Sequence, residues 1–409
     1  MTGTTDVIAR RAIEALRAGV PSRDAVAALG SGQSAIEDRF ETMCSSAAAG
    51  SPASMLIGGG FGAGKSHLLE HLARLALNNG WTVSRVVISK ETPLHDPAKV
   101  FRAAADSALR DGQARPAIIE AAAGLDLDGR SYAELLRWAS SSGSELNERF
   151  PATLTLYAHL RERDPAFAET ILRFWSGDTI AIPELRKRMR EIGEQRPVFS
   201  PVAAAELARQ RLRFAARLLA AAGAPGWLVL FDEVELIGRY SLLQRAKSYA
   251  ELARWMRGEQ GRGTPTAAVL AMTDDFEAAV ITGRNDRHVV PERLRTKGTP
   301  DAAELAVSAE LGMRIIDREM HLLTPPDDTE LKQVYARLRD LHGQAFGWHP
   351  PDVTGLERLG ANRMRQYVRA WINEWDLVRL DPGYRPETEA VTVTSDYRED
   401  PDLERTEPE

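Results

Sequence analysis

The sequence has little cysteine, little lysine and no long apolar run. Cys44 is the single cysteine in 409 residues, which excludes an internal disulfide framework and is typical of a reducing compartment. No apolar run approaches the roughly 18 residues of a membrane-spanning helix without meeting glycine, proline or a charge, and no window resembles a signal peptide. We therefore expect a cytoplasmic protein.

The charge balance is acidic overall and uneven along the chain. The net charge is −6, and nearly all of the basic residues are arginine because only seven lysines are present. The acids collect at the C-terminal end, where few apolar side chains accompany them, and this composition predicts an acidic, disordered tail over residues 381–409. A chain of 45.0 kDa is long enough to bury a full α/β core plus a helical domain.

An apolar run at residues 53–58 leads into a glycine-rich loop that ends in Lys-Ser. Residues 59–66 fit G-x-x-x-x-G-K-[ST], and an amphipathic helical pattern follows over 67–78. In this strand–loop–helix context, backbone N–H groups point at phosphate oxygens, Lys65 reaches the β- and γ-phosphates, and Ser66 binds Mg²⁺. The predicted ATP-binding residues are Gly59, Gly60, Phe61, Gly62, Ala63, Gly64, Lys65, Ser66 and His67.

A second apolar run, residues 227–232, ends in two carboxylates. Ligands gather at the carboxyl ends of buried parallel strands, so we expect Asp232 to hold Mg²⁺ and Glu233 to take a proton from the attacking water. Many P-loop kinases and GTPases lack the adjacent acid. The alternative is a strand followed by a solvated acidic turn, which the upstream glycine loop disfavours.

Five apolar runs predict a parallel five-stranded sheet within an α/β fold, because helical patterns alternate with them. The strands are expected at residues 53–58, 82–88, 227–232, 266–272 and 320–323. The expected units are N-terminal helices (1–50), a first core segment (51–92), a helical insertion (93–225), a second core segment (226–324), a helical lid (325–380) and the acidic tail (381–409).

Other polar residues have both a functional and a structural interpretation. Thr273 follows the fourth strand, where it could orient the attacking water or simply end the strand. Arg363, Arg365 and Arg369 begin the last lid helix, and Arg365 is our choice for a residue that reaches the γ-phosphate. A surface position is the alternative. Arg293 and Arg295 are candidates for a finger on a neighbouring subunit's nucleotide.

Two further patterns favour the structural interpretation. His67 and His71 have i, i+4 spacing, which suits metal ligands, but no other ligand set converges on them in sequence. Arg186, Lys187, Arg188 and Arg190 form a basic cluster in the insertion. A solvated helix face is the default there, and a DNA-binding groove is the sharper alternative.

With these residues in place, the chain resembles the P-loop ATP-binding proteins of bacterial BREX-type phage-defence loci, within the AAA+ ATPases similar to the Orc/Cdc6 group. The segments that carry the resemblance are residues 11–21, 59–67, 174–177, 231–235 and 365–369. The resemblance implies an ATPase of antiviral islands that acts with a helicase or another DNA-processing partner. Orc/Cdc6-like proteins carry a DNA-binding winged helix after the lid, whereas only about 30 residues of this sequence follow residue 378, so direct DNA binding is not expected unless the insertion supplies it.

The sequence therefore predicts an AAA+-type ATPase that hydrolyses ATP with Mg²⁺ and acts in a defence complex, with nucleotide-dependent oligomerisation as a further expectation. A second hypothesis is a nucleotide-dependent scaffold or switch with little hydrolysis of its own, which recruits a helicase or nuclease. A kinase on a small substrate fits less well, because Asp232 and Glu233 suit water activation.

Overall fold

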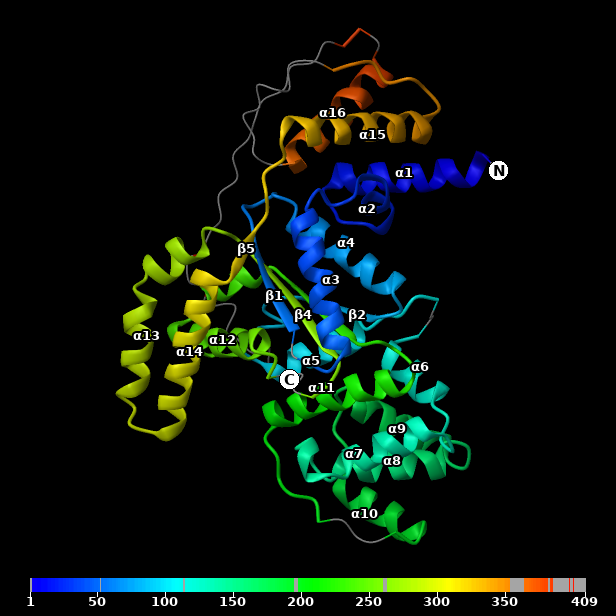
Figure 1. The fold of residues 1–409 in the computed structure, drawn as a ribbon, viewed down its shortest axis with the longest axis vertical. Helices are drawn as coiled ribbons and strands as arrows, with labels where there is room; N and C mark the ends of the chain where they lie inside the picture. The colour runs from blue at the N-terminus through cyan, green and yellow to red at the C-terminus, as the bar shows by residue number, and fades with distance from the viewer. Residues whose placement is uncertain are drawn as a thin grey trace.

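A parallel sheet lies at the centre of the molecule (Figure 1). The computed structural model describes residues 2–51, 53–112, 115–194, 198–259, 263–353, 364–381, 383–384, 397 and 400. Its strands are β1 (Ala53–Gly58), β2 (Thr82–Val87), β3 (Trp227–Asp232), β4 (Thr266–Met272) and β5 (Met320–Leu322). All of the pairings are parallel, so the predicted five-stranded parallel sheet is confirmed, with β2 and β5 one residue shorter than expected.

The strand order is β2-β3-β4-β1-β5, which places β4 between the two strands that carry the sequence motifs. In the β1–β4 pair Gly58 lies opposite Met272, and in the β3–β4 pair Phe231 lies opposite Leu270. The carboxyl ends of β1, β4 and β3 therefore meet at one edge of the sheet. This edge is where parallel sheets bind ligands.

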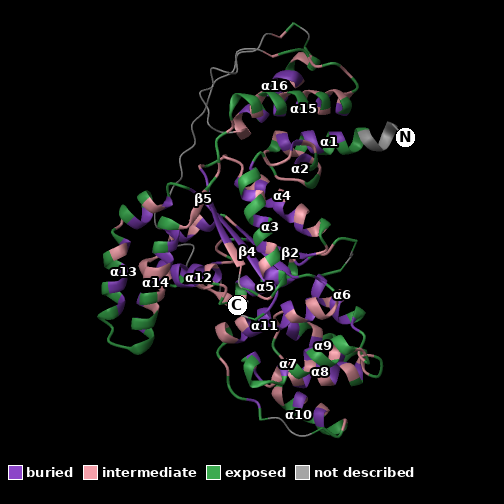
Figure 2. Cartoon of the chain, viewed as in Figure 1, coloured by how far each residue is buried: buried purple, intermediate pink, exposed green. Residues whose placement is uncertain are grey.

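Helices cover both faces of the sheet, which explains why β3 and β4 are continuous apolar runs. One face is covered by α3 (Ser34–Ala48) and α4 (Lys65–Asn78). The other face is covered by α5 (Pro97–Asp106), α11 (Ala204–Ala221), α12 (Leu242–Met256) and α14 (Pro300–Arg318). The central strands β3 and β4 are almost entirely buried (Figure 2), whereas the edge strand β5 is partly exposed.

The insertion forms a helical lobe that projects beyond α11 (Figure 1). Its elements are α6 (Ala117–Gly124), α7 (Arg130–Ala139), η1 (Ser142–Ser144), α8 (Arg149–Leu160), α9 (Pro165–Trp175) and α10 (Ile182–Glu191). Phe150, Phe214 and Trp175 stack with ring centroids 5.1 to 5.2 Å apart. The lobe and the sheet share one buried cluster through α5 and α11, so the insertion is a continuation of the core.

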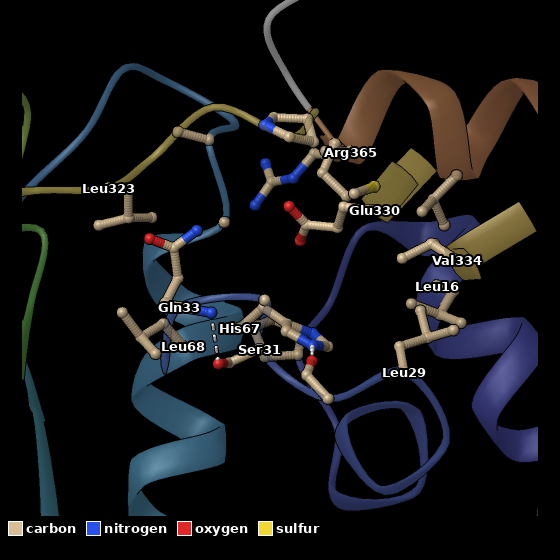
Figure 3. Close-up of a pocket in the computed structure, with 18 of the residues that line it drawn as sticks. Leu16, Leu29, Ser31, Gln33, His67, Leu68, Leu323, Glu330, Val334 and Arg365 are labelled. Atoms are coloured by element: carbon tan, nitrogen blue, oxygen red, sulfur yellow. Dashed lines mark hydrogen bonds between the residues drawn. The ribbon is translucent and has the colours of Figure 1, made fainter. Parts of the chain in front are cut away.

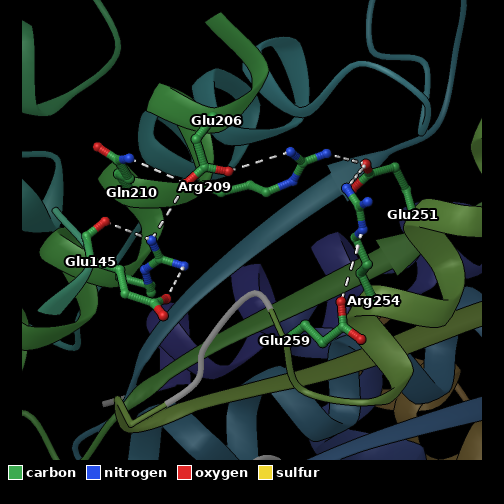
Figure 4. A network of polar contacts seen from close by, with 8 residues as sticks. Glu145, Glu206, Arg209, Gln210, Glu251, Arg254 and Glu259 are labelled. Carbon is green, nitrogen blue, oxygen red and sulfur yellow. Dashed lines mark hydrogen bonds and ion pairs between the residues drawn. The ribbon is translucent and has the colours of Figure 1, made fainter. Parts of the chain in front are cut away.

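A chain of alternating charges fastens the insertion to α12 (Figure 4). Arg209 of α11 pairs with Glu251 of α12, and Arg254 donates to the same carboxylate at 3.1 Å. The carboxylate of Glu206 joins Arg209 to Arg213, which also contacts Glu145 near η1. Because Arg213 and Glu251 are buried, these pairs are less screened than exposed ones, and they hold the lobe in one orientation.

The first two helices of the chain build a second lobe together with the last two helices of the described residues. It contains α1 (Thr2–Ala18), α2 (Arg23–Leu29), α15 (Asp328–Phe346) and α16 (Met364–Leu380). Ile13, Leu338 and Trp375 are fully buried in its core. The sequence grouped α1 and α2 with α3, but α3 packs on the sheet whereas α1 and α2 pack on the lid helices. The lid is therefore a four-helix lobe above the carboxyl edge of the sheet (Figure 1).

Three remaining elements follow β3 and β4. They are η2 (Val234–Arg239), a π-helix (η3, Glu277–Thr282) and α13 (Asp286–Arg295). Buried Arg245 holds the start of α13 through two bonds of 2.8 and 2.9 Å to Asp286. Within the described ranges, no helix is both long and apolar enough to cross a bilayer.

Candidate functional site

The glycine loop adopts the backbone conformation that an anion cradle requires. Gly62 and Gly64 have φ angles of 81° and 107°, which a side chain at either position would strain. Gly59 donates to Met272 O at 3.3 Å, which ties the start of the loop to β4. Within the described residues, the amides of Lys65 and Ser66 have no backbone acceptor, because they lie in the first turn of α4. The loop therefore presents free N–H groups and a helix N-terminus to a ligand.

Lys65 is buried and its ammonium lies across the mouth of this loop. Its Nζ donates to Gly59 O at 2.7 Å and to Gly60 O at 3.4 Å. The Oε1 of Glu235 lies 4.0 Å from the same nitrogen. Glu235 follows β3 by three residues, so the glycine loop and the acidic segment after β3 meet in the fold. A phosphate in the loop would replace the two carbonyl oxygens as the partner of the ammonium.

The two predicted carboxylates follow β3 in an unusual local conformation. Glu233 has a φ of 57°, a left-handed value that non-glycine residues rarely adopt. Its amide donates to Asp232 Oδ1 at 3.0 Å, which fixes the first carboxylate relative to the second. Burial raises the pKa of Glu233, the neighbouring Asp232 raises it further, and Lys65 opposes both effects. A raised pKa suits a carboxylate that must accept a proton.

Glu235 is a third acid of this site, to which the sequence assigned no role. Burial raises its pKa from an ordinary 4.5 to about 7, and the nearby ammonium of Lys65 limits the rise. Its Oε2 is buried without a hydrogen-bond partner in the described residues. In the sequence, the only feature that pointed to a role for Glu235 was its position two residues after Glu233. Glu235 lies 4.0 Å from the Lys65 ammonium, and the cost of burying its negative charge lowers the stability of the folded protein.

We expect Glu235→Gln to stabilise the protein at alkaline pH. A carboxyl whose folded pKa lies near 7 contributes stability below pH 4.5, and this contribution is lost as the pH rises toward and through 7. Glutamine keeps the shape without the charge, and Lys65 keeps its two carbonyl partners. The gain at pH 8 should be about 1–3 kcal/mol, seen as a higher thermal midpoint.

The control for this variant is Glu304→Gln, at an exposed position of α14. Thermal midpoints measured at pH 5 and pH 8 should show a Glu235→Gln gain that is several-fold smaller at the lower pH, and no comparable change for Glu304→Gln. A gain of equal size at both pH values would contradict a cause in the buried charge.

Thr273 lies beside the loop, as expected if β4 neighbours β1. It is fully buried, and the next residue, Asp274, approaches Gly60, where an added Cβ would come within 3.9 Å of the aspartate Oδ1. The Thr273 hydroxyl hydrogen-bonds Tyr397 Oη. Tyr397 belongs to the predicted disordered tail, most of which lies outside the described residues.

A pocket adjoins the loop between the sheet and the lid lobe (Figure 3). Leu16, Leu29 and Val334 form an apolar wall from the lid lobe, and Leu68 and Leu323 close the opposite side. The polar groups around it come from Ser31, Gln33, His67, Thr324, Glu330 and Arg365. An apolar slot with a few polar groups beside a phosphate-type loop fits a flat heteroaromatic base.

Two amide contacts and one histidine contact fix the walls of this pocket. The Gln33 side chain donates to Thr324 O at 3.0 Å and accepts from Thr324 N at 2.9 Å. These two bonds join the start of α3 to the segment between β5 and α15. The Nε2 of His67 lies 2.7 Å from Gly30 O, and burial lowers the pKa of His67. His67 therefore has a structural role at the pocket wall, and sequence reasoning missed Gln33.

The backbone of Gly32, in the pocket lining, favours glycine. An added Cβ at Gly32 would lie 1.7 Å from Glu330 Oε1, and the residue has a φ of 67°. The close approach brings the segment between α2 and α3 against α15. A side chain at this position would displace the Glu330 carboxylate and would strain the backbone at its positive φ.

Arg365 reaches from the lid helix α16 into the pocket, as Figure 3 shows. Its guanidinium lies 6.0 Å from the ring centroid of Phe61 in the glycine loop. Phe61 itself is exposed, and Arg365 also packs near Gly19 of the segment after α1. The structure thus places Arg365 next to the predicted loop, whereas Arg363 lies outside the described residues.

The site has the oxygen donors that suit magnesium, although it is not a cage of protein ligands. Within the described residues, no group of three or more His, Cys, Asp or Glu side chains could hold a metal ion. Mg²⁺ usually keeps several waters and takes one or two carboxylates plus phosphate oxygens. Ser66 in the first turn of α4 and Asp232 at the end of β3 are partly accessible, so both can supply such oxygens.

The remaining candidates lie away from this edge. Arg293 and Arg295 are exposed on α13, and Arg295 pairs with Glu310 at 2.7 Å. In the basic cluster, Arg188 is paired with Asp164 at 3.0 Å, and Arg186 stacks on Phe199. Acidic residues thus partly neutralise this helix face. His71 lies near Glu37 and belongs to no metal site in the described part of the chain.

A comparison with known protein families identifies a related family over the part of the chain that contains the glycine loop. Residues 6–117 match the family described as BREX system ATP-binding protein BrxC/D. This match contains α1 to α5, β1, β2 and the whole glycine loop, and it confirms the resemblance to BREX-type ATP-binding proteins over that part of the chain. No curated protein and no solved structure matches the chain.

Proposed function

We propose that the protein binds ATP at the edge of the sheet where β1, β4 and β3 end, and that it acts in phage defence of the BREX type. The observation that carries the proposal is the convergence of Lys65, the acidic segment after β3 and the pocket under the lid. The family match over residues 6–117 supports ATP as the nucleotide.

The proposed binding mode assigns one part of ATP to each part of the site. The triphosphate lies in the loop, where the free amides of Lys65 and Ser66 and the Lys65 ammonium bind its oxygens. The base lies in the adjacent pocket between Leu16 and Leu68. Arg365 approaches from α16 and pairs with the γ-phosphate, which would make the lid position depend on the nucleotide.

Hydrolysis is the second part of the proposal. Glu233 takes a proton from a water that attacks the γ-phosphorus, Thr273 donates a hydrogen bond at the γ-phosphate or the water, and Lys65 neutralises developing charge. Ser66 and Asp232 would hold Mg²⁺, which would screen the phosphate charge. The left-handed conformation of Glu233 points to a site that is held under strain for function.

The same arrangement supports an AAA+-type motor or switch within a larger complex. The order β5-β1-β4-β3-β2, a helical lid and the long insertion are consistent with such a protein, and the insertion offers a surface for a helicase or another defence component. Direct DNA binding through α10 is less favoured, because its basic residues are partly paired.

The second candidate function, a nucleotide switch with little hydrolysis, has a specific observation in its favour. The Thr273 hydroxyl, which the hydrolytic mechanism requires, is already bonded to Tyr397. Such a protein would bind ATP tightly and turn it over slowly until a partner acts.

ATP binding by calorimetry and turnover by phosphate release, each with and without Mg²⁺, test the proposal. Single- and double-stranded DNA titrated at two salt concentrations separate a DNA-dependent enzyme from a switch, since electrostatic binding weakens steeply with salt. Tight binding with turnover supports the ATPase, and tight binding with low turnover in every condition supports the switch. A protein that binds no ATP would refute both.

A further inference from the structure

Tyr397 and Asp400 lie against the two segments that follow β3 and β4, although both residues belong to the acidic C-terminal segment. The ring of Tyr397 packs edge-on to Phe276 at 6.0 Å between centroids and also contacts Gly238, where an added Cβ would come within 3.2 Å. Asp400 pairs with Arg239 at 2.8 Å, and its amide donates to Arg239 O at 3.1 Å. We call the surface formed by Gly238, Arg239 and Phe276 the seat. It contacts the aromatic ring of Tyr397 and the carboxylate of Asp400.

The polar contacts of Tyr397 determine which hydroxyl donates. Its Oη lies 2.7 Å from Asp275 Oδ1 and also hydrogen-bonds Thr273 Oγ1. A carboxylate oxygen only accepts, so the single phenolic proton goes to Asp275. The Thr273 hydroxyl must then donate its own single proton to Tyr397 Oη. Arg284 completes the seat by donating to the Tyr397 carbonyl oxygen.

This donor pattern conflicts with the role proposed for Thr273. The oxygens of a γ-phosphate also only accept, so Thr273 can donate to the phosphate or to Tyr397 but not to both. We propose that Tyr397 competes with the γ-phosphate for the Thr273 hydroxyl, so that seated Tyr397 and Asp400 oppose nucleoside triphosphate binding and the bound triphosphate loosens these two residues. The inference rests on the proposed function, because it assumes that a nucleotide fills the glycine loop.

The competition is reciprocal, and it distinguishes triphosphate from diphosphate. A ligand that breaks the Tyr397–Thr273 bond must spend part of its own binding free energy on doing so, and the seated segment lowers its affinity by the same factor. ADP has no γ-phosphate and leaves the bond intact. ATP binding would thus release Tyr397 and Asp400 from the segments that follow β3 and β4, whereas ADP binding would not.

The test uses Tyr397→Phe in the full-length protein. Phenylalanine keeps the ring against Phe276 but frees the Thr273 hydroxyl. We expect a non-hydrolysable ATP analogue to bind roughly 2- to 13-fold more tightly to this variant, the range expected when a single hydrogen bond is released. ADP affinity should stay unchanged, and the KM for ATP should fall by a similar factor while kcat stays near the wild-type value, because the bond is already broken in the ATP complex. Asp400→Asn, which weakens the second anchor, should shift the same quantities in the same direction.

Tyr384→Phe is the matched control, because it makes the same change near the end of α16 away from Thr273. It should leave both affinities and kcat as in the wild type. Equal analogue affinity in Tyr397→Phe and wild type, or a lower kcat in the variant, would overturn the inference while leaving ATP binding intact. A wild-type protein that binds neither nucleotide would instead refute the proposed function, and the competition with it.

Discussion

Lys65→Ala is expected to weaken ATP binding by a factor of about 100 or more. The substitution removes a charge-assisted contact with two phosphate groups, and each such bond contributes about 1.5–3 kcal/mol. Within the described residues, no hydrogen bond joins another lysine or arginine to the loop carbonyls, and Arg365, the other cation proposed at the γ-phosphate, belongs to the lid helix α16 and not to the loop. Calorimetric titration with ATP and ADP measures the effect, which should be large for both nucleotides.

This experiment must distinguish a loss of ATP affinity from a loss of protein stability. Removing Lys65 leaves Glu235 buried without its cation at 4.0 Å, which could reduce stability on its own. The double variant Lys65→Ala/Glu235→Gln, compared with Glu235→Gln alone, isolates the contact with ATP. Lys99→Ala, on the exposed face of α5, is the control for the loss of a lysine. Unchanged ATP affinity in the double variant would show that the loop is not the phosphate site.

The parts of the site that sequence predicted are those encoded by contiguous residues. The loop from Gly59 to Ser66 is set by local backbone requirements, and β1, β3 and β4 are apolar runs long enough to be read directly. The position of Thr273 beside the loop could be predicted once β4 was assumed to neighbour β1. The structure shows this strand order. Each of these features is written within one short segment of the chain.

The parts that sequence did not predict depend on contacts between distant segments. Gln33 joins Thr324 across nearly 300 residues, and Tyr397 reaches Thr273 from the acidic tail. An amphipathic face shows that a helix packs on something but does not identify the partner, so α1 gave no sign that it packs on α15. Glu235 carried a local signal, yet its burial and its approach to Lys65 depend on the fold of η2.

Glu233→Gln is expected to keep ATP binding and to lower kcat by about 100- to 10,000-fold, the range lost with a general base. The amide cannot accept the proton of the attacking water, but it retains the size of the side chain and the left-handed backbone at this position. In the wild type, kcat should rise with pH through the pKa of Glu233, which burial and Asp232 raise above its ordinary value.

Steady-state phosphate release and ATP affinity must be measured on the same Glu233→Gln preparation, with the exposed Glu292→Gln of α13 as the control. Loss of turnover with ATP affinity within a factor of about 3 of wild type identifies the base, because binding and chemistry then separate as a group used only in the transition state requires. Undiminished hydrolysis would remove Glu233 from the mechanism. Glu235, with a pKa of about 7 and 4.0 Å from Lys65, would then be the acid to replace next.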